Sequence, residues 1–387
     1  MMTFHEASSS PQIIESIDLL QFKGTWLVLS RSVDGAVGIA ATTSRIDYLH
    51  PILTERIVPY FIGRDARQLP DLIDGVYRHH SNYKLVGLPF WSCVAWVEFS
   101  LVDLLGRVAK QPAGQMLGPV IRRHVPVYLS VLDRKSPPEK IAELLRDRLA
   151  RTGAKAVKVK IGGRMSGNAD AAPGRSADLL NTLRRVLPGD TTICVDANGS
   201  YDAETAIQVG RMLEEHGVGL FEEPCPFECY DETRRVAEAL HLPVAGGEQD
   251  SSALRWKDML RDHVVDVPQP DVIYNGGLVR TARVATMAEA NGRQVSFHNP
   301  HQGPSAAYAL HLASVITNPW SFHEFNVHHH SEAWYEPRLD VVGGMLAVPV
   351  TPGLGVEFDP SALARATLRH RARRFARVVL GRVTGLV

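Results

Sequence analysis

The sequence has few cysteines, no excess of charge of either sign and no long apolar run. Four of its 387 residues are cysteines, too few for a disulfide framework in a chain of this size. Basic and acidic residues number 42 each, so no overall attraction to nucleic acid is expected. No apolar run reaches the roughly 20 residues of a membrane span, and the polar start lacks a signal-peptide core. We therefore expect a reduced cytoplasmic protein with no nucleic-acid or membrane partner.

What the chain does contain is three acidic residues at equal intervals, each ending a short apolar run. Asp196 ends Thr-Ile-Cys-Val-Asp, and Glu222 and Glu248 each follow 26 residues after the one before. Because a strand, a helix and two turns take about that length, the three carboxylates are expected at the same end of successive parallel strands. Converging carboxylates repel one another unless a cation neutralises them. Three oxygen ligands with no cysteine or histidine among them favour Mg²⁺.

The wider pattern predicts an α/β fold that begins with an α+β region. Three strands separated by turn residues are expected at 13–20, 25–32 and 36–41, and helices over 49–110. From Val125 onward strands alternate with helices, which predicts a (β/α)₈-type barrel whose active site lies at the carboxyl ends of the strands. The expected barrel strands are Val125–Val131, Ala156–Ile161, Thr192–Asp196, Gly219–Glu222, Pro243–Gly247, Val264–Val267, Gln294–Phe297 and Ser321–Glu324.

Two lysines lie in the second of these strands, in Ala-Val-Lys-Val-Lys-Ile-Gly-Gly. Alternation places Lys158 and Lys160 on one face. Two ammonium groups that face a barrel interior are costly unless the site is polar or catalytic. Each is expected to lower the pKa of the other, and a nearby cation to lower both, which leaves a neutral amine as a base near pH 7. Lysines that point to solvent are the alternative, and the apolar neighbours argue against it.

Polar residues also follow the last three expected strands. Asp271 and His298 end the sixth and seventh, whose ends lie close together in a barrel, so the aspartate can hold one imidazole nitrogen and leave the other for proton transfer. A lone histidine is more often structural, and the pairing favours a catalytic role. Glu324 ends the eighth strand and would complete a ring of polar groups.

Taken in order, these motifs resemble the mandelate racemase subgroup of the enolase superfamily, over about residues 13–360. The stretches Val-Asp-Ala-Asn and Phe-Glu-Glu-Pro around Asp196 and Glu222 resemble the superfamily signature. The resemblance implies a modified (β/α)₇β barrel over 121–335, with an α+β capping domain formed by 1–120 and completed by 336–387. It also implies a homo-oligomer, often an octamer in this family.

The resemblance further implies a role for each candidate residue. Asp196, Glu222 and Glu248 would hold Mg²⁺, and an α-proton would be abstracted from a carboxylate substrate through an enediolate. Lys160 and His298 would be acid/base catalysts on opposite faces of the substrate, and Asp271 would orient His298. Lys158 and Glu324 would contact the substrate carboxylate or the developing enolate. The residues expected to contact substrate are Lys158, Asn198, His301 and Glu324.

Two opposed catalysts permit either dehydration of an acid sugar to a 2-keto-3-deoxy acid or racemisation of a hydroxy or amino acid. The short linker Gln21–Gly24, in a segment that often forms a long lid in the family, and the polar segment after His298 favour an acid sugar dehydratase. A catalytically degenerate member would lack ligands, and none is missing. A muconate-type cycloisomerase would place a lysine near Asp271, where this chain has none. The Arg-rich segment 361–387 is expected to be a solvated helix, with a nucleic-acid or phospholipid arm as the alternative.

Overall fold

The computed structural model describes residues 2–328 and 334–384, with side chains up to residue 372. It begins with an antiparallel sheet, β1-β2-β3, whose strands are Ile14–Phe22, Thr25–Ser32 and Val37–Ala41. The expected linker Gln21–Gly24 is a tight hairpin turn, because Lys23 and Gly24 have φ values of 47° and 80° and join β1 directly to β2. The helices that follow the sheet are α1 (Ile46–Pro51), α2 (Val58–Phe61), α3 (Leu69–Arg78), α4 (Leu88–Ala109) and α5 (Ala113–Leu117).

Helix α4 is the core helix of this first part. It packs against β2 and β3, and all but a few of its side chains are buried. By length and composition α4 could cross a membrane, contrary to the expectation that no run is long enough. However, 89% of the most apolar 18-residue stretch of α4 is buried inside the molecule, as in the core helix of a globular fold.

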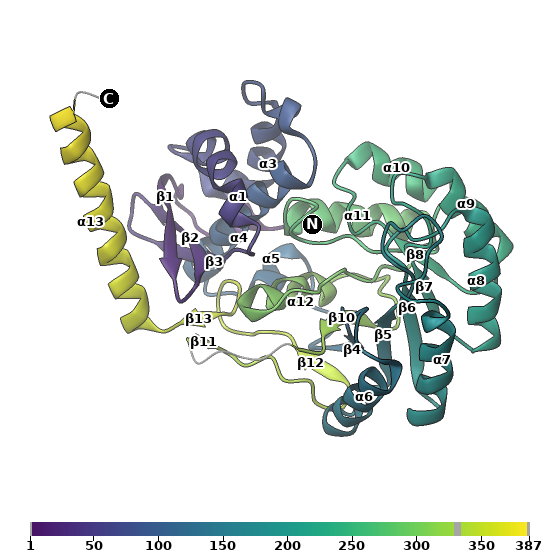
Figure 1. The fold of residues 1–387 in the computed structure, drawn as a ribbon. Helices are drawn as coiled ribbons and strands as arrows, with labels where there is room; N and C mark the ends of the chain where they lie inside the picture. The colour runs from purple at the N-terminus through teal and green to yellow at the C-terminus, as the bar shows by residue number, and fades with distance from the viewer. Residues whose placement is uncertain (1, 329–333, 385–387) are drawn as a thin grey trace.

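The second part is a curled parallel sheet with helices on its outer side (Figure 1). The strand order is β10-β4-β5-β6-β7-β8-β9, so each strand from β4 to β9 pairs with the next along the chain. The strands are β4 (His124–Ser130), β5 (Ala156–Lys160), β6 (Thr192–Asp196), β7 (Leu220–Glu222), β8 (Val244–Gly246), β9 (Val267–Pro268) and β10 (His323–Asn326). The helices are α6 (Pro138–Thr152), α7 (Arg175–Val186), α8 (Ala203–Glu215), α9 (Tyr230–Ala239), α10 (Ala253–Arg261), α11 (Leu278–Ala290) and α12 (Tyr308–Ala313).

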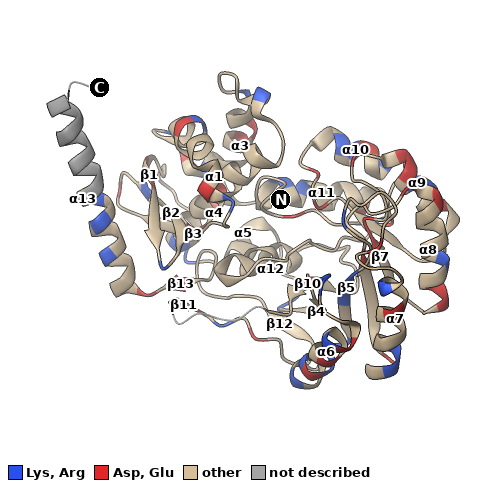
Figure 2. Cartoon of the chain, in the orientation of Figure 1, with Lys and Arg blue, Asp and Glu red and all other residues tan. Residues whose placement is uncertain are grey.

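This architecture confirms the predicted α/β barrel class, and the helices show why the sequence forms it. In α6 the buried side chains Ile141, Leu145 and Leu149 recur every four residues and form the stripe that faces the sheet. The helix ends at Gly153, whose φ of 67° suits a glycine. Charged residues of both signs are mixed on the outer helices (Figure 2).

The prediction of a seventh strand over Gln294–Phe297 is wrong as stated. Within this segment the structure has one isolated bridge, Val295 to Pro319, and the bridge of His298 to Asp271 lies just after it. One reason is that the Phe297 N–H donates to the His323 side chain at Nδ1 (3.0 Å) and not to a strand carbonyl. The sixth strand is also shorter and later than expected, since β9 consists of Val267 and Pro268 alone.

The C-terminal segment returns across both parts. Strand β12 (Met345–Ala347) pairs antiparallel with β4, and β11 (Tyr335–Glu336) pairs with β13 (Glu357–Phe358). Helix α13 (Pro360–Thr384) then lies beside β1 (Figure 1). The Arg-rich end is therefore helical as expected. The division into 1–120, 121–335 and 336–387 and the homo-oligomeric state stay predictions.

Candidate functional site

The strand register brings three of the candidate residues side by side. Lys160 pairs with Asp196, and Asp196 pairs with Glu222, at the carboxyl ends of β5, β6 and β7. Glu248 follows β8 after Gly247, whose φ of 104° and close approach to Trp256 leave no room for a side chain. The turn at Gly247 thus places Glu248 next to the strand ends.

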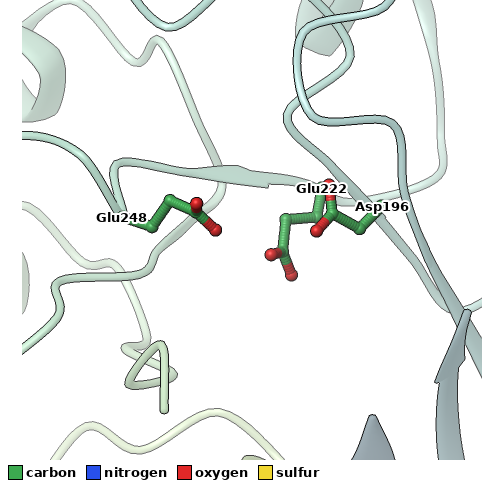
Figure 3. A group of neighbouring side chains, drawn as sticks. All are labelled: Asp196, Glu222 and Glu248. Carbon is green, nitrogen blue, oxygen red and sulfur yellow. The ribbon is translucent and has the colours of Figure 1, made fainter. Parts of the chain in front are cut away.

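The three carboxylates converge, as Figure 3 shows. One oxygen from each of Asp196, Glu222 and Glu248 lies within 4.8 Å of the others, and all three residues are buried. The pKa of Glu222 is raised to about 7. Burial and the charge of Asp196 raise this pKa, and the charge of Lys158 partly offsets them. A set of buried oxygens that repel one another is suited to a hard divalent cation. The residues present therefore fit Mg²⁺.

Both lysines point toward this trio. Lys158 Nζ lies 2.7 and 2.8 Å from the two carboxylate oxygens of Glu222 and 2.9 Å from Glu324. Lys160 Nζ contacts Asp196. Burial lowers the pKa of Lys158, but Glu222 and Glu324 outweigh it and raise this pKa well above its usual range. The expected lowering is thus wrong for Lys158, because carboxylates and not only an ammonium group surround it.

His298 connects the carboxylate of Asp271 to the trio. Its Nδ1 lies 2.8 Å from Asp271 Oδ2, and its Nε2 lies 3.0 Å from Glu248 Oε2. Burial lowers the pKa of His298, but Glu248 and Asp271 outweigh it and raise this pKa well above its usual range. The predicted contact between Asp271 and His298 is therefore present, and Nε2 is the imidazole nitrogen that faces the trio.

Of the four residues expected to contact substrate, one lines the cavity and three lie among the buried polar groups around it. Asn198 lines the cavity above the trio, where its backbone N–H donates to Asp196 (2.7 Å). His301 Nε2 lies 3.0 Å from Asp271 Oδ2, the same oxygen that contacts His298. Lys158 and Glu324 are buried and pair with each other. Of these four residues only Asn198 is among those that line the cavity, and the substrate roles of all four stay predictions.

The cavity of about 470 Å³ also has residues that the sequence did not indicate. Arg134, in the loop after β4, donates to Asn198 Oδ1 (2.8 Å). Arg45 comes from the N-terminal part and donates to the Tyr274 hydroxyl (3.0 Å). Arg134 lies four residues after a strand end, a signal that could have identified it, whereas nothing in the sequence links Arg45 to the barrel. The lining residues are Arg45, Leu88, Leu132, Arg134, Lys160, Arg164, Met165, Asn198, Glu248, Gln249, Tyr274, His298 and Pro300.

The hairpin turn that was expected to influence substrate choice lies elsewhere. Gln21, Lys23 and Gly24 line a separate hollow against Arg365 and Arg369 of α13. Among the described residues, none of Gln21–Gly24 lines the cavity beside the trio. The short turn therefore leaves this cavity uncovered by β1 and β2.

Comparisons with known proteins agree with this geometry. The model of the enolase C-terminal domain-like family matches residues 140–362, more than half of the chain. The chain is 28% identical over 327 residues to arabinonate dehydratase from Saccharolobus solfataricus, covering 83% of this chain and 85% of that protein. It is 30% identical to 3,6-anhydro-alpha-L-galactonate cycloisomerase from Streptomyces coelicolor, covering 79% and 80% of the two chains.

Solved structures give the same result. A crystal structure from Roseobacter denitrificans, provisionally described as a racemase, superimposes with a TM-score of 0.86 at 32% identity over 92% of this chain and 98% of that one. A mandelate racemase/muconate lactonizing protein from Paracoccus denitrificans, crystallised with magnesium, has the same fold at 23% identity, with a TM-score of 0.81 over 92% and 98%. The chain therefore belongs to the enolase C-terminal domain-like family of enzymes.

Proposed function

We propose that this enzyme removes the α-proton of an acid sugar and eliminates a β-hydroxyl group, which gives a 2-keto-3-deoxy acid. One observation carries the proposal. Lys160 and His298 come from different parts of the barrel and line one cavity together with Glu248 of the carboxylate trio. Two proton-transfer groups beside a cation site are what abstraction next to a carboxylate requires.

Asp196, Glu222 and Glu248 would hold Mg²⁺, which supplies positive charge to the substrate carboxylate as the proton leaves. Lys160 accepts the α-proton when the C–H bond breaks. The His298 imidazolium then donates its Nε2 proton to the β-hydroxyl, the C–O bond breaks and water departs. The resulting enol becomes the 2-keto acid. Asp271 holds His298 Nδ1–H throughout and so keeps Nε2 as the transferring nitrogen.

The lining of the cavity supports a polyhydroxylated substrate. Hydrogen-bonding side chains from Arg134, Asn198, Gln249 and Tyr274 are available to hydroxyl groups. Several relatives are named as dehydratases of sugar acids, including arabinonate, D-xylonate and D-galactonate. Together these features favour elimination over racemisation of a small or apolar acid.

An isomerase is the second candidate. The same two groups could remove a proton from one face and return one to the other, and relatives named as cycloisomerases match the chain. The two reactions differ in the substrate atom that the acid protonates. In isomerisation it is a carbon atom, and in dehydration it is the oxygen of the leaving hydroxyl group. This choice depends on the substrate and not on the catalytic pair alone.

A substrate library distinguishes the two functions. Aldonic and aldaric acids are incubated with the enzyme and Mg²⁺ and scored for 2-keto product. Formation of a 2-keto-3-deoxy acid supports the proposal. If no acid gives this product while an α-proton exchanges with solvent deuterium in a hydroxy or amino acid, the isomerase is correct.

Replacement of the two catalysts gives the first residue-level prediction. Lys160→Ala and His298→Asn should each reduce kcat by about 10²–10⁴-fold, because each removes one proton transfer. The matched control is Lys155→Ala, since Lys155 precedes the same strand but is exposed and pairs with Asp190. Circular dichroism should show all three variants folded. Near-normal turnover in either catalytic variant would contradict its assigned role.

A further inference from the structure

The cavity beside the trio contains more positive charge than the proposed reaction uses. Arg45, Arg134 and Arg164 all line it, in addition to Lys160. Among the described residues that line it, Glu248 is the single carboxylate, and Glu248 belongs to the cation site. The three guanidinium groups come from separate segments, namely the loops after β3, β4 and β5.

In the part of the chain that the structure describes, the guanidinium groups of Arg45 and Arg134 have only neutral hydrogen-bond partners. Arg134 donates to Asn198 Oδ1 (2.8 Å) and to the backbone carbonyls of Gly162 (3.3 Å) and Asp196 (3.4 Å). Arg45 donates to the hydroxyls of Tyr274 and Tyr48, at 3.0 Å each.

Arg164 completes the set. Its backbone N–H donates to Ser200 Oγ (2.9 Å), which anchors the loop, while its guanidinium makes no hydrogen bond or ion pair with the described residues. Arg45 and Arg134 are half-buried, and Arg164 is exposed. Half-buried arginines elsewhere pair either with acids, as Arg107 does with Asp103 at 2.7 Å, or with backbone carbonyls, as Arg184 does with Thr191 at 3.0 Å. The three cavity arginines share a position in one lining and have no ion pair with an acid among the described residues.

Arg134 is the most firmly placed of the three. Its contact with Asn198 connects it to Asp196, because the Asn198 N–H donates to that carboxylate. Arg164 lines the same cavity from the loop after β5. Two cationic groups that line one cavity are stabilised by an anion that binds to both.

We propose that the substrate carries a second anionic group, a carboxylate or a phosphate, which Arg134 and Arg164 bind in the cavity beside Asn198, with Arg45 adding charge from the loop after β3. This inference rests on the proposed function, which places the first carboxylate of the substrate at the trio. The substrate class is therefore an aldaric acid or a phosphorylated aldonic acid. The relatives named above as dehydratases act, by their names, on acids with one carboxylate.

The test compares matched substrates at saturating Mg²⁺. Each aldaric acid is paired with the aldonic acid of the same carbon number and configuration, and with its terminal phosphate ester. A kcat/KM for the aldarate or the phosphate ester at least about tenfold above the aldonate supports the proposal, since one charge-assisted hydrogen bond has about that value. The two dianionic arms distinguish carboxylate from phosphate. Equal or better use of the aldonate overturns the proposal.

Variants of the cavity arginines test which residues cause the preference for a dianionic substrate. Arg164→Gln should lower kcat/KM for the dianionic substrate about tenfold and leave the aldonate nearly unchanged, and Arg164→Lys should restore part of the loss. Arg134→Gln should lower kcat/KM for both substrates, because Arg134 is also available to hydroxyl groups, but the loss should be larger for the dianionic substrate. The control is Arg146→Gln on α6, which pairs with Asp147 at the surface. An equal loss for both substrates in Arg134→Gln and Arg164→Gln would indicate a structural role and overturn the assignment.

Binding separates this inference from the proposed function. Calorimetry with the His298→Asn enzyme and Mg²⁺ measures affinity without turnover. Tighter binding of the dianion, lost in the double variant with Arg164→Gln, supports the second anion site even if the reaction is not a dehydration. If aldonates are dehydrated but dianions bind no better, the proposed function stands and this inference fails.

Discussion

At the scale of single residues, the site depends on one carboxylate that two histidines share. Asp271 Oδ2 lies 2.8 Å from His298 Nδ1 and 3.0 Å from His301 Nε2. Burial raises the pKa of Asp271, but His301 and His298 outweigh it and keep this pKa well below its usual range. Asp271 therefore stays ionised and fixes the orientation of His298.

Replacement of this aspartate tests that role. Asp271→Asn should lower kcat by about 10²–10⁴-fold, because an amide does not stabilise the His298 imidazolium, and a neutral imidazole is a much weaker acid at Nε2. Substrate KM should change little. The pH profile of kcat, followed by 2-keto product formation, should lose the limb that belongs to His298. His301→Gln is the matched variant, since glutamine can still donate to Asp271, and its kcat should fall much less. Equal losses in the two variants would contradict the division of roles.

Residues at or just after the expected strand ends could be predicted from the sequence, whereas a residue that reaches the cavity from the N-terminal part could not. Asp196 and Glu222 each end an apolar run, so alternation and spacing determine their position. Lys158 was placed on the correct face, but its acidic neighbours Glu222 and Glu324 lie 64 and 166 residues away in the chain. Arg45 reaches the cavity only because the N-terminal part packs on the barrel. No local sequence pattern indicates this packing.

At the scale of elements, one buried carboxylate connects the core helix of the first part to the barrel. Glu98 of α4 accepts hydrogen bonds from the backbone N–H groups of Leu278 (2.6 Å) and Val279 (2.8 Å) at the start of α11. These N–H groups have no partner within their own helix. Asp271 precedes α11 by seven residues, so Glu98 also helps to hold the loop that carries Asp271 and Tyr274.

The pH dependence of stability tests this contact. Burial raises the pKa of Glu98 to about 8, although the N–H groups of Val279 and Leu278 lower it. Between the unfolded value, about 4.3, and this folded value the native state holds a proton that the unfolded chain has lost. The stability contributed by Glu98 is thus full below pH 4.3 and declines as pH rises to 8, by at most about 1.4 kcal/mol per pH unit.

Glu98→Gln removes this titration. The variant should be less stable than the wild type at pH 5.5, because an amide offers one acceptor where the carboxyl group offers two. The difference in free energy of unfolding should shrink toward pH 8.5, since only the wild type loses stability through Glu98. Denaturant titrations in chelator at both pH values measure it, and other titrating groups cancel between the two proteins. A difference that is constant with pH would contradict the raised pKa.

The boundaries of elements show where local patterns fail. The strands β4 to β6 were predicted within one residue because each is a β-branched run with many ladder partners. Segment 294–297 has the same apolar alternation, but its backbone groups bond to Asn318, Pro268 and the side chain of His323. Pro268 also has no N–H for a ladder. The pattern identified the position of this wall of the barrel but not its hydrogen bonds.

At the scale of the whole molecule, the cation site connects four strands through buried charges of both signs. Asp196, Glu222 and Glu248 come from successive strands, and the ammonium groups of Lys158 and Lys160 lie against two of them. The lysines offset part of the repulsion between the carboxylates, while Glu248 is held by His298. A cation that binds the folded chain alone should therefore stabilise the entire barrel.

Metal removal gives the corresponding prediction. Mg²⁺ at a hundred times its dissociation constant should add about 2.7 kcal/mol to the free energy of unfolding and raise Tm, and chelator should reverse the change. Glu248→Gln should weaken the metal-dependent shift, because it replaces a charged oxygen ligand with a neutral one. Glu139→Gln on the exposed surface of α6 is the control, and its shift should match the wild type. Thermal unfolding across a Mg²⁺ series measures all three proteins. An equal shift in Glu248→Gln and the wild type would show that the ion binds elsewhere, since Glu248 belongs to the buried trio and Glu139 does not.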